Sequence, residues 1–366
     1  MRGLTALDRA ALSASPRNRN AERFPAVARE LLEHGADMTI RGAVALADVS
    51  RIRELVEADG KLLRQIDRNG GLLSIAANHN QVEVVRLLLD LGADVDEKVM
   101  LEELEEPTPS WGFPLWYAAL AGQRDIVQLL LERGADPNAN VYASGWPLRN
   151  AWDHPDPSVK ELLLEHGAKR EPYMIAEQHD IVEASRMLAA EPSENLARDF
   201  AVSAADHGCP AILELALPLI KQALDDRAWH WILIQPIRGA GDDSSDNEGH
   251  FRSMEMLLSH GVDANVSRYG ATALHFAAAY HGPVSDRDRA RFAGILLDHG
   301  AKLDVRDDLL RSTPLGWACR WGRKQLAEVL IANGAEIDEP HAEPWATPKA
   351  WARKMKQREI EALLNR

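Results

Sequence analysis

One short phrase recurs along this chain and restricts its possible folds more than any other feature of the sequence. It consists of two or three apolar residues, two variable residues and then Gly-Ala-Asp or a close variant, as in LLLERGAD at 129–136. The apolar residues are spaced to bury one face of a helix, and glycine supplies the left-handed residue that ends a helix without a Cβ clash. The glycines of the seven copies are Gly35, Gly92, Gly134, Gly167, Gly261, Gly300 and Gly334.

A second signature precedes several of these helix stops: a turn followed by a short helix rich in alanine. It reads FPLWYAALAGQ at 113–123, TALHFAAAYHG at 272–282, TPLGWACRWGR at 313–323 and TPKAWARKMKQ at 347–357. Thr caps such a helix, and Pro follows at the first helical position, where its missing N–H costs nothing. Gly134 and Gly167 are 33 residues apart, and Gly300 and Gly334 are 34 apart. The spacing indicates an array of helical units rather than two or three unrelated domains.

Together these signatures resemble the ankyrin-repeat family. The residues that carry the resemblance are Thr313-Pro314-Leu315 with the stop at Gly334, and Thr272, Leu274 and His275 at the start of their unit. The resemblance runs from a degenerate inner helix at 5–11 to a C-terminal capping unit at 346–366. It implies an all-α solenoid of about eleven helix-turn-helix units, several of them degenerate, in a single continuous array over residues 1–366. It also implies that His275 hydrogen-bonds between neighbouring turns, and that fingers and inner helices line a concave groove.

The long intervals between glycines are expected to contain units without the usual stop. Residues 44–60 form one compact pair that ends at Gly60, and three further units begin at 172, 200 and 227. Three insertions lengthen the period: an acidic finger at 96–111, a flexible inter-helix loop at 239–249 and a segment at 281–289. The acidic run at 96–106 is expected to be a solvated face or a patch for a basic partner. The Gly, Asp and Ser content of 239–249 predicts the most mobile internal segment.

Charge and cysteine content exclude several classes of function. The formal net charge of −14 argues against nucleic acid and against an anionic membrane as the main partner. The two cysteines, Cys209 and Cys319, are too few for a disulfide framework or a Cys-rich zinc site, and they fit a reducing compartment. The sequence shows no signal peptide and no spanning segment, so we expect a cytoplasmic monomer.

Ten residues are candidates for binding a partner. Most of them follow the inner helices, where the repeat register places polar and aromatic side chains of distant segments on the same side, and Trp111 lies in the acidic finger. They are Asn78, His79, Trp111, Asp153, His154, Asp206, His207, Tyr280, Arg320 and Trp321. No nucleophile, nucleotide-binding or metal-binding motif is present, so no catalytic residue, metal or cofactor is expected.

The family resemblance implies a non-catalytic scaffold that binds a protein partner through the concave groove and fingers, although a fold does not by itself fix a function. The alternative is an enzyme with a polar site in the groove, built from the Asp-His pairs at 153–154 and 206–207 and including metal-assisted hydrolysis. A third class is a purely structural spacer. Exposed tryptophans would favour binding, and a polar pocket closed by the 239–249 loop would favour the enzyme.

Overall fold

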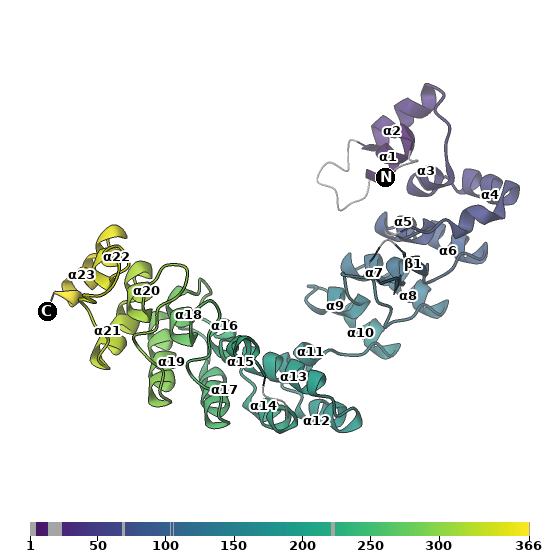
Figure 1. Ribbon diagram of the computed structural model, residues 1–366. Coiled ribbons are helices and arrows are strands. Elements are labelled where there is room, and N and C mark those ends of the chain that lie inside the picture. The colour runs from purple at the N-terminus through teal and green to yellow at the C-terminus, as the bar shows by residue number, and fades with distance from the viewer. Residues whose placement is uncertain are drawn as a thin grey trace. The chain divides into compact units, whose positions relative to one another are not determined.

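The computed structural model describes residues 5–13, 24–67, 70–102, 104, 106–220 and 224–365. The chain divides into two compact units, Met1–Arg170 and Glu171–Arg366. Each unit is a row of helix pairs (Figure 1). The described residues form five pairs in the first unit and six in the second. These pairs agree in number with the predicted units, and the all-α repeat fold is confirmed.

The first helix of each pair is called inner and the second outer. In the first unit the pairs are α1 (Ala6–Ser13) with α2 (Phe24–Glu33), α3 (Ile40–Ala45) with α4 (Val49–Ala58), α5 (Leu72–Asn78) with α6 (Val82–Asp90), α7 (Phe113–Leu120) with α8 (Arg124–Glu132), and α9 (Pro147–Trp152) with α10 (Ser158–Glu165). A short 3-10 helix, η2 (Gly60–Arg64), follows α4. The antiparallel strands β1 (Val99–Leu101) and β2 (Thr108–Ser110) form a hairpin before α7.

The second unit contains the remaining pairs. They are α11 (Pro172–Glu177) with α12 (Ile181–Ala190), α13 (Glu194–Asp206) with α14 (Pro210–Ala216), α15 (Asp226–Leu233) and α16 (Gln235–Gly239) with α17 (Glu248–Ser259), α18 (Ala273–Ala279) with α19 (Asp286–Asp298), α20 (Pro314–Trp321) with α21 (Lys324–Ala332), and α22 (Pro348–Lys354) with α23 (Arg358–Leu364). The 3-10 helix η3 (Leu217–Leu219) extends α14.

The helix stops behave as the sequence predicts. All seven stop glycines have positive φ, including +88° at Gly134 and +84° at Gly300. In α8, which precedes Gly134, the buried residues Ile126, Val127 and Leu130 lie on the side that packs within the array. Gly60 differs, because it begins η2 and is not a left-handed stop. The end of that second pair therefore lies at Ala58 and not at a glycine.

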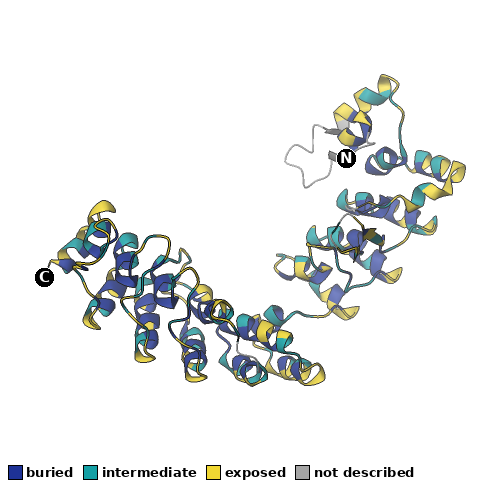
Figure 2. Ribbon diagram, viewed as in Figure 1, coloured by how far each residue is buried: buried dark blue, intermediate teal, exposed yellow. Residues whose placement is uncertain are grey.

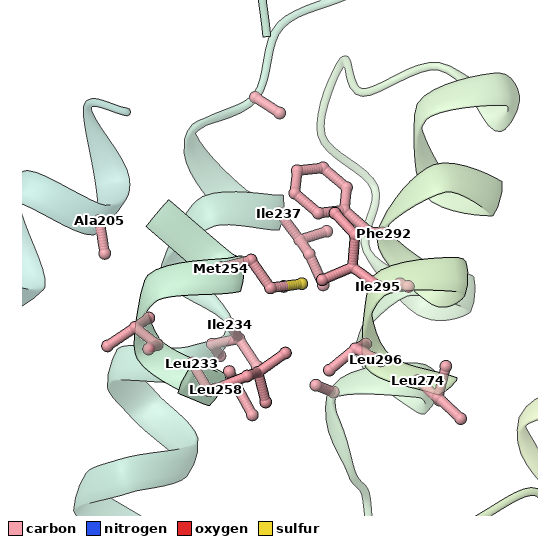
Figure 3. Packing of buried hydrophobic residues seen from close by; sticks show 14 of the residues in the cluster. Ala205, Leu233, Ile234, Ile237, Met254, Leu258, Leu274, Phe292, Ile295 and Leu296 are labelled. Atoms are coloured by element: carbon pink, nitrogen blue, oxygen red, sulfur yellow. The ribbon is translucent and has the colours of Figure 1, made fainter. Parts of the chain in front are cut away.

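Within each unit, neighbouring pairs pack against each other through their apolar faces. Inner helices contact inner helices, as α5 contacts α7 and α18 contacts α20, and outer helices such as α19 and α21 contact each other in the same way. In the second unit one buried cluster extends from Ile175 to Leu364. Figure 3 shows part of it, where Met254 of α17, Ile237 of α16 and Phe292 of α19 point toward one another. Buried residues lie where helices face each other, and exposed ones gather at the turns (Figure 2).

The bridging role expected for His275 is confirmed. The Thr272 backbone N–H donates to His275 Nδ1 at 3.1 Å, so Nε2 carries the proton and donates to the Ser312 carbonyl of the next turn, also at 3.1 Å. Because the ring is buried, its pKa falls to about 4 and it stays neutral. One imidazole therefore joins two successive turns.

Two insertions differ from their predictions in form. The 96–111 finger contains the β1–β2 hairpin, which the acidic composition did not suggest. The loop between α16 and α17 is confined to 240–247, since Gly239 belongs to α16 and Glu248 to α17. The side chain of buried Asn247 closes this loop through hydrogen bonds. It accepts from the Gly241 N–H at 2.9 Å and donates to the Gly241 carbonyl at 3.1 Å. It also donates to the Asp288 carboxylate at 2.8 Å.

An arginine is fully buried at the start of α19. The guanidinium of Arg289 donates to the carbonyls of Ala277 at 2.6 Å, Val284 at 3.1 Å and Gly282 at 3.3 Å. It thereby satisfies carbonyls at the C-terminus of α18 and in the connection that follows. Burial lowers the pKa of Arg289 to about 10, so the side chain still carries its charge.

Candidate functional site

Nine of the ten candidate residues lie at or directly after the ends of inner helices. In the first unit these are Asn78 and His79 at the end of α5, and Asp153 and His154 after α9. In the second they are Asp206 and His207 at the end of α13, Tyr280 after α18, and Arg320 and Trp321 at the end of α20. The two groups belong to different units and are described separately. The tenth candidate, Trp111, lies in the finger that precedes α7.

In the first unit the candidate histidines are used for packing between repeats. His79 is half-buried and hydrogen-bonded to the backbone of Leu12 in α1, and burial lowers the pKa of its imidazole. His154 lies over Gly122 in the preceding repeat, where an added Cβ would be 2.4 Å from the His154 Cε1 atom. His154 Nδ1 also accepts a hydrogen bond from the Asp156 N–H at 3.2 Å. Its neighbour Asp153 is exposed.

Trp111 connects two fingers. Its indole Nε1 donates to the Asp136 carboxylate at 3.2 Å, and its backbone N–H donates to the Asn140 carbonyl at 3.3 Å. Both acceptors belong to the following finger. The ring is half-buried, so intramolecular packing already uses much of its surface.

In the second unit three imidazoles gather at the C-terminus of α13. His207 Nδ1 lies 2.9 Å from the Ser203 carbonyl, His179 Nε2 lies 3.1 Å from the His207 carbonyl, and His250 Nε2 lies 3.0 Å from the Asp206 carbonyl. Burial lowers the pKa of His250. The contacts to Asp206 and His207 satisfy carbonyls that a helix end leaves without intrahelical partners, whereas the Ser203 carbonyl also accepts the backbone N–H of His207 at 3.0 Å.

Glycines allow the backbone to approach closely around these histidines. A Cβ at Gly239 would be 1.6 Å from the Asp206 carbonyl oxygen, and one at Gly249 would be 2.1 Å from the Gly208 oxygen. A Cβ at Gly208 would also contact the His250 ring at 2.8 Å. The histidine cluster is therefore part of the packing between the end of α13, the end of α16 and the start of α17.

The remaining candidates are grouped around α18, α20 and α22. Tyr280 stacks on Phe276 with ring centroids 5.0 Å apart and donates its hydroxyl to the Arg238 carbonyl at 3.1 Å. Trp321 meets the exposed ring of His281 edge-on at 4.2 Å. The Arg320 guanidinium lies 4.4 Å from the centroid of Trp351 in α22.

The geometry of the two Asp-His pairs is better suited to contacts with other residues than to acid–base catalysis. Within the described ranges, neither His154 nor His207 hydrogen-bonds to the carboxylate of the aspartate that precedes it. Those ranges also contain no group of three or more His, Cys, Asp or Glu side chains arranged to hold a metal ion.

Both cysteines are free and buried, and burial raises the pKa of the Cys319 thiol to about 12, so this thiol is protonated at neutral pH. None of the helices in these ranges has the length and apolar character that a membrane span requires.

The acidic finger contains a buried carboxylate that the sequence reading placed on a solvated face. Glu97 is only 3% exposed, and its neighbour Asp96 is also buried, so the prediction of a solvated face is wrong at these two positions. The Glu97 carboxylate accepts hydrogen bonds from the backbone N–H groups of Gly71 at 2.6 Å and Leu73 at 2.7 Å. Ser74 donates both its backbone N–H and its hydroxyl. Burial raises the pKa of Glu97 to about 6.

Sequence reasoning missed a row of apolar side chains on the finger tips of the second unit. Tyr269 is 70% exposed, Leu309 is 77% exposed and Trp345 is 49% exposed. They lie in the successive fingers before α18, α20 and α22. The signal in the sequence is weak, because each is a single apolar residue in a polar turn, and scattered exposed apolar residues are normal.

Comparison with known proteins places these observations in a family. Residues 42–141 and 245–341, together more than half of the chain, match the family described as ankyrin repeats, in three copies. A curated relative, the palmitoyltransferase ZDHHC13 of Mus musculus, is 36% identical over 108 residues. The match covers 29% of this chain and 16% of that protein, so this chain corresponds to only a small part of the relative.

Proposed function

This chain belongs to the ankyrin-repeat family, and from that premise we propose that it is a non-catalytic scaffold that binds a protein partner. Its repeats serve generally as protein-interaction modules, and the finger tips and inner-helix ends of the second unit supply the contact residues. The proposal includes a cytoplasmic monomer, with which the free thiols of Cys209 and Cys319 are compatible.

The observation that carries the proposal is the row of apolar finger tips. The Asp308 N–H donates to the Tyr269 carbonyl at 2.9 Å, so the fingers of Tyr269 and Leu309 are directly joined. Trp345 of the next finger meets the Trp351 ring edge-on, with centroids 6.4 Å apart. Large apolar side chains that remain exposed on neighbouring turns support a protein contact, since such anchors contribute most of the energy of an interface.

Groove residues complete the proposed contact. Trp321 and Arg320 adjoin the same set of repeats, and tryptophan and arginine are enriched among the residues that dominate binding energy. The Asp-His pair at 206–207, part of the basis for the enzymatic alternative, contributes polar rim contacts in the second unit in this proposal. The pair at 153–154 belongs to the first unit and is not part of this contact.

The test is capture of a partner from an extract of the source cells by the full chain. The variant replaces Tyr269, Leu309 and Trp345 together by Ser. We expect capture to be lost while the midpoint of thermal unfolding changes little, because the side chains are exposed. The matched control is Val182→Ser, which removes an 81% exposed apolar side chain from α12, outside the fingers. Equal capture by the variant and by the control would refute the finger-tip contact.

A further inference from the structure

The end of the second unit is locally basic although the chain is acidic. Residues 344–358 contain five Lys and Arg and no Asp or Glu, whereas the whole chain has a net charge of −14. The segment runs from the finger tip at Trp345 through α22 to Arg358, the first residue of α23. Lys349 pairs with Asp338 at 2.5 Å, but Arg353, Lys354, Lys356 and Arg358 are exposed and form no ion pair within the described residues. Lysine and arginine in the last turn of a helix interact favourably with the helix dipole. This accounts for the positions of Arg353 and Lys354 in α22, but not for Lys356 and Arg358, which follow that helix.

Two of the cations in this region converge on one indole. The Arg320 guanidinium lies 4.4 Å, and the Lys354 ammonium 5.0 Å, from the centroid of Trp351. Trp351 is only 2% exposed and donates its Nε1 proton to Ser312 Oγ at 2.7 Å, so it is a fixed platform. The ends of α20 and α22 are also in contact, because Gln357 Nε2 donates to the Arg320 carbonyl at 3.5 Å.

Two hydrogen-bond donors at the same place lack acceptors. The Arg320 Nε and Trp321 Nε1 atoms are buried and have no hydrogen-bond partner among the described residues. A buried donor without an acceptor destabilises a structure by about 1–3 kcal/mol, so such donors are rare. Arginine and indole N–H groups are satisfied by carboxylate oxygens, as they are by carbonyl and water oxygens. A carboxylate is the acceptor among these that also complements the positive charge of Arg320 and Lys354.

We propose that a basic cluster binds a short acidic segment of the protein partner, rich in Asp or Glu. The cluster consists of Arg320, Trp321 and Lys354 around Trp351, together with the exposed residues Arg353 and Lys356 next to Lys354 in sequence. This inference rests on the proposed function and names the chemistry of the partner. A short segment places its carboxylates against the cluster alone. A nucleic acid or an anionic membrane would extend beyond the cluster, and the net charge of −14 of the chain would repel it.

The experiment measures binding of a fluorescein-labelled oligoglutamate peptide to the full chain by fluorescence anisotropy. We expect binding that weakens as salt rises, and no binding of the matched oligoglutamine peptide. The double variant Lys354→Glu with Lys356→Glu should bind the peptide at least about tenfold more weakly, because each reversal turns attraction into repulsion. The control is Lys302→Glu with Arg227→Glu, which makes the same charge change at exposed positions of the second unit outside the cluster. Thermal unfolding of each variant verifies the fold.

Three results would overturn the proposal. They are equal peptide binding by the two double variants, equal binding of the glutamine peptide, and binding of single-stranded DNA or phosphatidylserine vesicles without binding of oligoglutamate. Capture of the native partner is measured in parallel with the same variants. If the wild type captures a protein but the Lys354/Lys356 variant captures it equally well, the acidic-segment proposal fails and the scaffold function stands. If the wild type captures none, the scaffold function itself fails.

Discussion

Glu97 and Glu339 occupy equivalent positions in different units, each five residues after a stop glycine and each with a positive φ, +45° and +42°. Both carboxylates are buried and reach the start of the inner helix of the preceding repeat. Glu97 accepts from backbone N–H groups at the start of α5, and Glu339 accepts from the Thr313 hydroxyl at the cap of α20, at 2.6 Å. Arg306 donates to the second oxygen of Glu339 at 2.8 Å. At Ile40, Ala139 and Val266 the equivalent position carries a buried apolar residue.

Glu97→Gln should destabilise the first unit by about 1–3 kcal/mol at neutral pH. Both carboxylate oxygens of Glu97 accept hydrogen bonds from backbone N–H groups. In either orientation of a glutamine amide, its NH2 group therefore faces one of these N–H donors, and that hydrogen bond is lost. Chemical denaturation measures the loss. The control is Glu106→Gln, an exposed position in the same finger, for which no change in the free energy of unfolding is expected. Equal effects of the two substitutions would disprove the capping role.

The buried imidazole of His275 should make the second unit sensitive to acid. Its pKa is about 4 in the folded chain and 6.5 in the unfolded chain. The stabilisation is therefore complete above pH 6.5 and is lost as the pH falls towards about 4, by up to about 3 kcal/mol. His275→Gln keeps a capping side chain but cannot titrate. We expect the difference in unfolding free energy between wild type and this variant to shrink as the pH falls from 6.5 to 4; a constant difference would contradict the assignment.

The pKa of Glu97 predicts a pH dependence of opposite sign in the first unit. The folded value of about 6 is higher than the unfolded value of 4.5. The contribution of this carboxyl to stability is thus fully present below pH 4.5 and is reduced as the pH rises through about 6, by about 2 kcal/mol. Titration of the Glu97 side-chain carboxyl by NMR measures the value directly. A midpoint below 4.5 would show that the four hydrogen bonds outweigh burial.

Gly134→Val should destabilise the chain by at least about 1 kcal/mol, because a β-branched residue is strained at a φ of +88°. No atom lies within 4 Å of an added Cβ at Gly134, so the loss would come from the backbone and not from a clash. Gly294→Ala is the matched control. Gly294 also has free space but lies within α19, where alanine should stabilise the helix by about 0.5–1 kcal/mol. The expected effects therefore have opposite signs in equilibrium unfolding.

Arg289→Met should cost about 2–4 kcal/mol, since it leaves buried carbonyls at the end of α18 without donors. Arg287→Met removes a charge two residues away, where the side chain is 64% exposed and pairs with Asp243 and Asp288. Its effect should be below about 1 kcal/mol. If the two variants unfold at the same denaturant concentration, the buried guanidinium is not what holds this connection.

Asn247→Ala should make the 240–247 loop the first site of limited proteolysis. The asparagine side chain joins Gly241 to Asp288, and its removal releases both contacts. Asp243→Ala removes an exposed side chain that pairs with Arg287, and the rate of cleavage should then stay close to that of the wild type. Rapid cutting of the wild type at this loop would instead favour the mobile segment that the composition predicts.

The periodic features of the sequence predicted the periodic features of the fold. Gly134 and Gly300 could be assigned to left-handed helix stops because the local phrase alone requires that conformation. Glu97 could not be assigned, because its acidic neighbours suggest solvent and its hydrogen-bond donors come from the preceding repeat. A signal did exist: the cap of α5 is Gly71, without the hydroxyl that Thr313 supplies in α20. The missing cap at Gly71 and the carboxylate of Glu97 in the next repeat predict this hydrogen bond only when the two repeats are compared.

The candidate site was predicted less completely. The repeat register placed Trp321 and His207 correctly at inner-helix ends, since position follows from the period. Their contacts depend on side chains of other repeats, such as His281 against Trp321, and no pattern within one repeat specifies them. The exposed finger tip at Leu309 was missed for the same reason.

The bond from Glu97 to Gly71 also determines where the array can be divided. A Cβ at Gly71 would lie 2.6 Å from the Glu97 carboxylate, so the two positions must change together. A fragment cut after the stop at Gly92 would contain α5 but not the group that caps it. A segment that contains α5 can therefore be transplanted, deleted or duplicated with these hydrogen bonds intact only if it extends beyond the sequence repeat into the following finger. Gain or loss of repeats in such a chain conserves the fold only where the breakpoints respect that overlap.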